Sequence, residues 1–306
     1  IRQIDKGQLL RHYDLRIGKG SKIQDIQFKI GSNLTYNAID YAVEAIMRSS
    51  EASNADEILQ YEQELIYHAM IAFHTNLEVV TIKDTLRSST VMTNNTDFSA
   101  TPADQWDEYN SPSSDPIEDI KRKVLRIKSR TGSSPNIVLM HDMVWDVVQR
   151  HPKSLERGGV HPSGNAIITK EQFENICDLP PGSLQTTSQT YNIADEGGAA
   201  SDFRSFIAAD VIMAFVEPPS MRTYGLGCSF MWPGDIGGDM TQRAGVGGPF
   251  VVLQFPDNNR DPRGANVLRI VGGMDQKVLN VDAAELFIKV VDQTDTSAFG
   301  SFINNY

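Results

Sequence analysis

The feature that most limits the fold is a long amphipathic helix predicted between residues 54 and 84. Apolar residues recur there every three to four positions, the period of a helix with one buried face. Asn54 can cap the first turn, and Glu57 stands three residues further on, as in a capping box. At 1.5 Å per residue the helix would be roughly 45 Å long, which exceeds the usual helix of a compact globule. The pattern therefore predicts a strut along which other elements pack.

The segments before this helix predict an arm and a hairpin. Residues 1–20 are polar and interrupted by glycine, which favours an extended arm. Residues 21–31 alternate polar and apolar, and residues 35–47 form a second candidate strand, so a hairpin is expected over 21–50. Residues 38–47 could instead be helical. An arm and a hairpin of this length cannot bury themselves on a compact globule, which favours a partner over an ordinary surface hairpin.

Charge is unevenly distributed along the chain. The net charge is −11, yet residues 1–30 hold seven Lys or Arg against three Asp, so this segment carries +4 and the remainder −15. Such a segment can bind nucleic acid or lie on the acidic surface of a neighbouring copy. We favour the second interpretation because the basic residues alternate with apolar ones rather than cluster. The candidate inter-subunit contact residues are Arg2, Lys6, Arg11, Arg16, Lys19, Lys22, Phe28 and Lys29.

The middle of the chain is predicted to form a loop, a helix, a buried strand and a short helix. Residues 88–114 are rich in Ser, Thr, Asn, Asp and Pro, and Trp106 is expected to anchor this loop. A second helix is predicted at about 115–131. Ser114 or Asp115 can cap it, and Pro116 occupies its first position. The strand is the apolar run at 136–140, after which Asp142 stands at the expected N-cap of the short helix.

His141 and Asp142 raise the question of catalysis. His-Asp pairs ligate metals in one class of phosphohydrolases, so a metal-dependent hydrolase is one alternative function. Such a centre needs further His and Asp ligands, and none of the five other histidines recreates that arrangement. The Gly-rich stretch 232–249 lacks the Gly-Lys-Ser/Thr ending of a phosphate-binding loop. We therefore expect a structural role for the pair, and no catalytic, metal-binding or cofactor-binding residues.

The cysteines and the apolar runs indicate the compartment of the protein. Two cysteines without CxxC spacing are compatible with a reducing compartment. No run approaches the roughly 20 apolar residues that span a bilayer, so no membrane contact is expected.

Another capped helix is predicted at 167–177, starting at Thr169. Strands are expected at 206–216, 250–255 and 267–271, with a strand or short helix at 283–291.

The order of these parts resembles the tailed-phage major capsid proteins of the HK97-like fold, in particular the lambda capsid-protein branch. The resemblance covers most of the chain. Its most specific part is WDEYNSPSSDPIEDIKRKVLRIKSRTGSSPNIVLMHDMVWDVVQRHPK, residues 106–153. There a Trp-Asp and an SDP precede a helix ending in Thr-Gly, followed by an apolar strand, a Trp-bearing helix and an HP. No single motif is diagnostic, so the case depends on order and spacing.

The resemblance implies an α+β fold with named parts. These are an N-arm at 1–20, an E-loop hairpin at 21–50, a P domain with the long spine helix at 51–133, an A domain at 134–245, and a return to the P domain with a C-terminal tail at 246–306.

The resemblance also implies a function without enzymatic activity. The chain would self-assemble through hexamers and pentamers into an icosahedral shell around phage double-stranded DNA, assembled in the host cytoplasm and located in the virion. Its expected partners are itself, scaffold and portal proteins, a decoration protein as a further candidate, and DNA through non-specific contact. An encapsulin-like compartment around a cargo protein is the alternative within the same fold. Some relatives join a hairpin Lys to a neighbour's Asn. Here Lys19, Lys22 and Lys29 could meet Asn258 or Asn259, but we expect no such bond.

Overall fold

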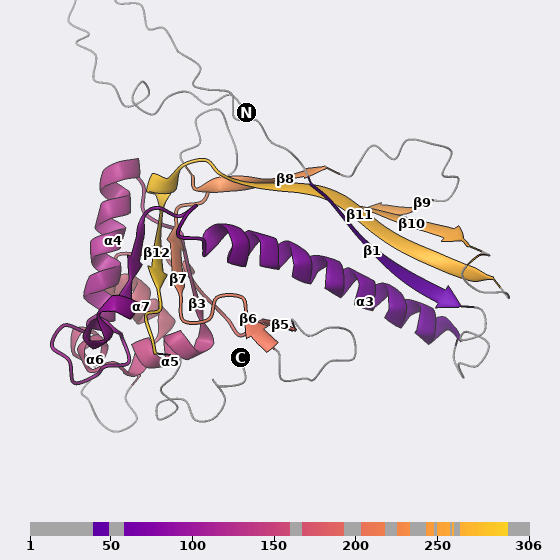
Figure 1. Ribbon diagram of the computed structural model, residues 1–306. Helices are drawn as coiled ribbons and strands as arrows, with labels where there is room; N and C mark the ends of the chain where they lie inside the picture. Colours follow the sequence, from indigo (N-terminus) through magenta and orange to yellow (C-terminus); the bar gives the residue numbers. More distant parts are fainter. Residues whose placement is uncertain are drawn as a thin grey trace, which may run out of the picture.

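Two five-stranded sheets organise the protein: a long antiparallel sheet that lies along one extended helix, and a central mixed sheet with shorter helices around it (Figure 1). The computed structural model describes residues 39–48, 58–159, 167–192, 203–217, 225–232, 243–247, 250–257, 259 and 264–292. Both helices and sheets contribute to the architecture, as the α+β prediction requires.

The long sheet has the order β1-β11-β10-β9, and β8 also pairs with β11. Alternate side chains of β1 and β11 face the long helix, because successive residues of a strand point to opposite faces. Val43 pairs with Ile270 in this register, and both pack against the helix with Phe73. The strands are β1 (Ile39–Arg48), β8 (Gly227–Trp232), β9 (Arg243–Gly247), β10 (Phe250–Pro256) and β11 (Ala265–Val278).

Strand β1 decides one open question of the sequence. Residues 39–48 form a strand, so the helical alternative for 38–47 is wrong. The strand forms because successive side chains make contacts on opposite faces of β1. Val43 faces the helix, while Glu44 on the opposite face accepts a hydrogen bond of 2.6 Å from Nε of Arg269. The described partner of β1 is β11. The other half of the expected hairpin, residues 21–31, lies outside the described residues.

The predicted long helix is present as two joined segments. Helix α3 (Ile58–Glu78) continues directly into the π-helix η1 (Val79–Leu86), two residues beyond the expected end at residue 84. The backbone N–H of Arg87 donates to the carbonyl of Ile82, five residues earlier, at 2.8 Å, and the hydroxyl of Thr85 donates to the carbonyl of Val80 at 2.9 Å. This is the spacing of a π-helix, a rare element that departs from the α-helical ladder. Asn54, the expected cap, lies outside the described residues.

The composition of this helix also corrects the expectation about membranes. By length and composition, one helix in the described part, Gln63–Leu86, could cross a membrane. One side of it packs on the long sheet through Ala69 and Phe73, each 5% exposed. Packing accounts for the apolar residues on that side, whereas only 11% of the most apolar window is buried. On the other side of the helix, Tyr67 and Ile71 are exposed in a single chain.

The end of the helix is attached to the central part of the molecule. Arg87, directly after η1, donates from Nε to Asp210 at 2.6 Å and from its terminal nitrogen to the carbonyl of Phe206 at 2.8 Å. Asp210 is 5% exposed and also accepts the backbone N–H of Lys289 at 2.9 Å. The helix is thus held at this end and extends away from it (Figure 1).

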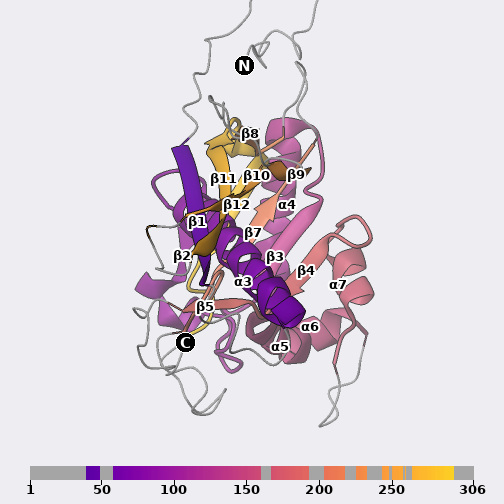
Figure 2. The ribbon, with the colours of Figure 1, turned by 90° about the vertical axis from the view of Figure 1, so that its right-hand side faces the viewer.

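The central sheet has the order β2-β12-β7-β3-β4, and a two-stranded sheet, β5-β6, lies apart from it. The strands are β2 (Asn95–Asp97), β3 (Ile137–His141), β4 (Leu184–Thr187), β5 (Thr190–Asn192), β6 (Phe203–Ser205), β7 (Val211–Ala214) and β12 (Ala284–Ile288). The helices are α4 (Pro116–Thr131), α5 (Asp142–Arg150), α6 (Pro152–Arg157) and α7 (Lys170–Ile176), with the short 3₁₀ helices η2 (Phe98–Ala100), η3 (Pro102–Asp104) and η4 (Val281–Ala283). Figure 2 shows α5, α6 and α7 grouped at one end of this part.

Several sequence-based assignments match these elements. The expected strands at 250–255 and 267–271 are confirmed as β10 and the longer β11, and the ambiguous 283–291 contains a strand, β12. The run 206–216 contains only β7, because the chain turns at Ala208, whose φ is +53°. Thr169 caps α7 with a complete capping box, as predicted.

Trp106 anchors the loop before α4, as expected. Its side chain is fully buried and packs on Phe98 and Phe287, with ring centroids 6.2 and 5.7 Å away. Its Nε1–H donates to Asp119 at 3.1 Å, and its backbone N–H donates to Val290 at 2.7 Å. The loop is thereby joined to both α4 and the end of β12.

Packing and strand pairing connect segments on both sides of the expected boundaries at residues 133/134 and 245/246. Helix α4 shares one hydrophobic core with β3 and α5. Strand β12 lies inside the central sheet, because it forms backbone pairs with both β2 and β7, while β8 pairs with β11 in the long sheet. The domain division itself stays a prediction.

Candidate functional site

His141 and Asp142 lie where β3 meets α5. His141 has extended backbone angles, and its Nδ1 accepts the backbone N–H of Met143 at 3.1 Å. His141 is therefore the N-cap, and the prediction of Asp142 at this position is wrong by one residue. Asp142 is already helical, in the first turn where a carboxylate is stabilised by the helix dipole. His141 can serve as the N-cap because a neutral imidazole nitrogen accepts a hydrogen bond, as the side-chain oxygen of a usual cap residue does.

This geometry occupies one of the two ring nitrogens through which a histidine can bind a metal. Burial lowers the pKa of His141, although the neighbouring Asp142 carboxylate partly opposes this effect. Nδ1 already accepts a backbone hydrogen bond. Within the described ranges, no group of three or more His, Cys, Asp or Glu side chains is placed to hold a metal ion. What the pair does in this structure is to begin helix α5.

The capping role predicts a modest effect of mutation. We expect His141→Ala to lower the free energy of unfolding by about 1 kcal/mol, the usual cost of a lost cap. Asp142→Asn should cost less, because the helix keeps its cap. Urea denaturation of the two variants and the unmodified protein measures the difference. A stoichiometric bound metal that both substitutions abolish would contradict the structural role.

His151 forms a second histidine cap, between α5 and α6. Its Nδ1 accepts the backbone N–H of Lys153 at 3.2 Å, and its Nε2 lies 3.2 Å from the hydroxyl of Ser114. With Nδ1 as the acceptor, the neutral ring carries its proton on Nε2 and donates it to Ser114. The side chain of Lys153 donates to the carbonyl of Ser114 at 2.7 Å. The three residues join the start of α6 to the segment that leads into α4.

Acid should weaken this junction. Burial lowers the pKa of His151 to about 4, from an ordinary value near 6.5. The folded state therefore binds this proton less readily than the unfolded state, so the stabilisation is complete above about pH 6.5 and is lost as pH falls towards 4. In His151→Asn the cap acceptor remains but does not titrate. We expect the pH dependence of its stability to be flatter by about 3 kcal/mol over this range. Identical pH profiles for the two proteins would contradict this assignment.

Asp115 is confirmed as the N-cap of α4. Its side chain accepts the backbone N–H of Glu118 at 2.9 Å, with Pro116 in the first helical position. Arg157 of α6 donates to the same carboxyl group at 2.8 Å. Asp115 therefore both caps α4 and attaches α6 to it.

A buried ion cluster between α4 and β12 was not found from the sequence. Glu285 is fully buried, and its two carboxylate oxygens accept from Lys123 at 2.9 Å and from Arg130 at 3.0 Å. Arg126 approaches the carboxylate to 3.7 Å. The available signal was a lone acid within the apolar run Ala283–Val291, because a buried carboxylate requires a cation. The identity of its partners, more than 150 residues away, was not visible.

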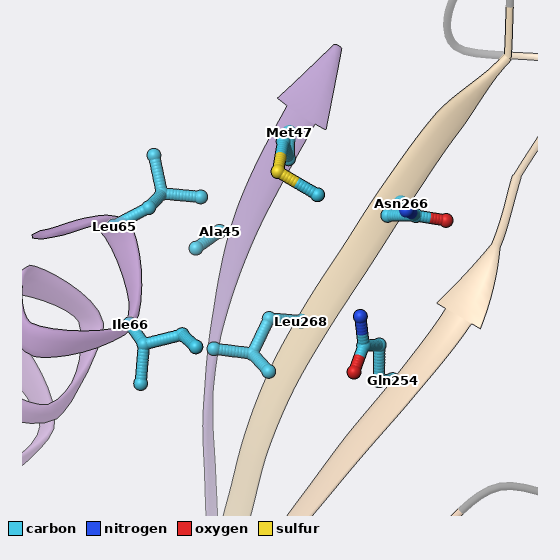
Figure 3. A pocket seen from close by; sticks show the side chains of 7 residues that line it. All are labelled: Ala45, Met47, Leu65, Ile66, Gln254, Asn266 and Leu268. Atoms are coloured by element: carbon cyan, nitrogen blue, oxygen red, sulfur yellow. The ribbon is translucent and has the colours of Figure 1, made fainter. Parts of the chain in front are cut away.

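The outward side of α3 is a candidate surface for assembly. Tyr67 is 61% exposed and Ile71 is 44% exposed, one turn apart on the helix. On the inner side of α3, a small pocket lies between the helix and the long sheet (Figure 3). Leu65 and Ile66 approach it from α3, while Gln254 and Asn266 lie towards its other side. The pocket is lined by Ala45, Met47, Leu65, Ile66, Gln254, Asn266 and Leu268.

The basic candidate contact residues cannot be placed on this surface from the structure. All eight, from Arg2 to Lys29 and including Phe28, lie outside the described residues. They stay a prediction.

Comparison with known proteins identifies the fold. No protein-family model matches the sequence, and no curated protein sequence matches it significantly. A crystal structure of a phage-related protein from Bordetella bronchiseptica is similar over 94% of this chain and 85% of its own, with TM-score 0.64 and 15% identity. The chain has the HK97-like fold.

A second solved structure is also similar to this chain. The encapsulin complex from Synechococcus elongatus covers 89% of this chain and 81% of its own, with TM-score 0.50 and 11% identity. Both similarities cover most of the chain.

Proposed function

We propose that the chain is the major capsid protein of a tailed bacteriophage, which assembles through hexamers and pentamers into an icosahedral shell around double-stranded DNA. The observation that carries the proposal is the outward side of α3, a helix that extends from the central part and exposes Tyr67 and Ile71 one turn apart. Two large apolar groups exposed together on an extended element are suited to a protein–protein contact. The similarity to a phage-related protein over 94% of the chain supports the proposal.

In this proposal the parts of the fold take the names given by the resemblance. Residues 51–133, with α3 and α4, belong to the P domain, residues 134–245 form the A domain, and residues 246–306 return to the P domain. Residues 1–20 are the N-arm and residues 21–50 the E-loop. Contacts between different surfaces of identical chains close into rings when their rotation permits. An extended chain with an uncovered side is suited to such contacts.

The proposal includes partners and a location. The chain binds itself first, then scaffold and portal proteins and a decoration protein, and it meets DNA through non-specific electrostatic contact. Assembly takes place in the host cytoplasm, and the mature shell is part of the virion. We assign the protein a structural role with no enzymatic activity and no cofactor.

An encapsulin-like compartment is the second candidate, favoured by the similarity to the encapsulin complex. The two functions differ in what the particle contains. After nuclease treatment, particles of a capsid protein should retain double-stranded DNA of a length set by the shell volume. Particles that retain a single cargo protein in stoichiometric amount, and no DNA, would favour the encapsulin-like function and contradict ours.

We expect the shell to be held together without covalent bonds between subunits. An isopeptide bond needs a neutral lysine and a dry pocket around the acceptor amide, because the ordinary lysine pKa is about 10.4. Asn259 is exposed, and its backbone N–H donates to Asp257 at 3.0 Å in a polar turn. Denaturing electrophoresis of mature particles should give one band near 33.9 kDa. A ladder of multimers that survives boiling and reductant would refute this expectation.

A further inference from the structure

The outward face of α4 has an apolar centre between two cations. Leu125 is 63% exposed, and the side chains of Arg122 and Arg126 are 70% and 52% exposed. Residues three and four apart on a helix are neighbours, so the three side chains share one face, the α4 face. Ile120 and Val124, on the inner side of the helix, belong to the hydrophobic core. Figure 1 shows α4 on the outer side of the central part, with β12 and β7 between it and α3.

Positive charge is concentrated on this helix. Residues 121–130 contain six Lys or Arg and no acid, in a chain whose net charge is −11. Lys123 and Arg130 turn inward and bind the buried carboxylate of Glu285. Arg126 stays 3.7 Å from that carboxylate, beyond hydrogen-bond distance, so its charge remains available on the surface. An occupant of the α4 face should therefore combine an apolar group with negative charge.

The segment that precedes α4 has this chemistry. Residues 88–120 contain seven acids and no Lys, Arg or His. Tyr109 is 41% exposed there, close to the exposed acids Asp104 and Glu108, and neither acid forms an ion pair with any residue that the structure describes. Buried Trp106 fixes the backbone between them. The stretch 104–109, the acidic loop, thus presents an aromatic group and unpaired negative charge on a held segment.

We propose that the α4 face of one copy docks on the acidic loop of a neighbouring copy. The inference rests on the proposed function and names a pair of surfaces that would join the copies. Both surfaces are exposed in the single chain, so the chain does not cover them itself. In the contact, Leu125 packs beside Tyr109, and the arginines of the α4 face meet the carboxylates of the loop. Because the two surfaces differ, repetition of this contact links copies head to tail, as a closed ring requires.

Charge reversal in the full-length chain tests the contact. Arg122→Glu and Glu108→Arg should each prevent particle formation under conditions in which the unmodified chain assembles, because like charges then face each other. The variant that carries both substitutions should form particles again. Lys170→Glu, which reverses an exposed cation on α7, is the control and should assemble normally. Sedimentation velocity measures the particle yield, and circular dichroism shows that each variant is folded.

Photo-crosslinking identifies the contacting segments directly. p-Benzoylphenylalanine replaces Leu125, and particles are assembled from an equal mixture of ¹⁵N-labelled and unlabelled chains, irradiated and digested. Trypsin has no site between Arg87 and Lys121, so the acidic loop is recovered within one peptide. We expect crosslinks from position 125 to this peptide, half of them joining differently labelled chains.

Several outcomes would overturn the inference. Normal particle yield from Arg122→Glu, no recovery in the folded combined variant, or crosslinks from position 125 only to other peptides or only within one chain would each show that the two surfaces do not meet. These results would leave the capsid function standing, because the unmodified chain had formed particles. Failure of the unmodified chain to form any particle would contradict the proposed function and, with it, the inference.

Discussion

Glu285→Ala is expected to lower the free energy of unfolding by about 3–5 kcal/mol, the usual cost of removing one partner of a buried ion pair. The substitution leaves Lys123 and Arg130 without their shared carboxylate. The Lys123 side chain is only 12% exposed, so water cannot replace the lost oxygen without rearrangement. A cavity between α4 and β12 adds to the cost. Urea denaturation of unassembled subunits measures the effect.

Two matched variants isolate the role of burial. Glu285→Gln keeps the volume and one acceptor oxygen, so its cost should fall between those of the unmodified protein and Glu285→Ala. Glu118→Ala removes a partly exposed acid that contacts Arg122 at 3.2 Å and Arg157 at 3.3 Å, and such surface pairs contribute at most about 1 kcal/mol each. Equal losses for Glu118→Ala and Glu285→Ala would show that the buried cluster has no special importance.

Removal of residues 1–20 is expected to abolish normal shells. If the segment joins neighbouring copies, the truncated chain should remain as soluble subunits or form aberrant assemblies, although the described elements stay folded. Sedimentation velocity and electron microscopy measure assembly, and circular dichroism serves as the control for folding. Normal shells that merely package DNA poorly would show that the segment contacts DNA instead.

Local patterns predicted well the elements whose causes are local. Ser114 or Asp115 before Pro116, and Thr169, indicated the starts of α4 and α7, because a cap depends on residues within one turn. The alternation in β1 and the long helix were likewise visible. The cap of α5 was placed one residue late because a histidine ring nitrogen, not the usual side-chain oxygen, accepts from Met143.

Features that depend on distant contacts could not be predicted. Glu285 meets Lys123 and Arg130 only after β12 joins the central sheet, and no local pattern encodes a pairing across more than 150 residues. The backbone pairing that places β12 between β2 and β7 is likewise a distant contact. The π-helical segment also has no simple sequence pattern, since Thr85 differs from other helical threonines only in its choice of acceptor.

The proposed function requires that this chain build closed shells, which electron microscopy of the purified, nuclease-treated protein can show. We expect closed particles of uniform diameter, with five-fold and six-fold clusters of subunits visible in class averages. Discrete monomers or small oligomers under all conditions that keep the chain folded would contradict it.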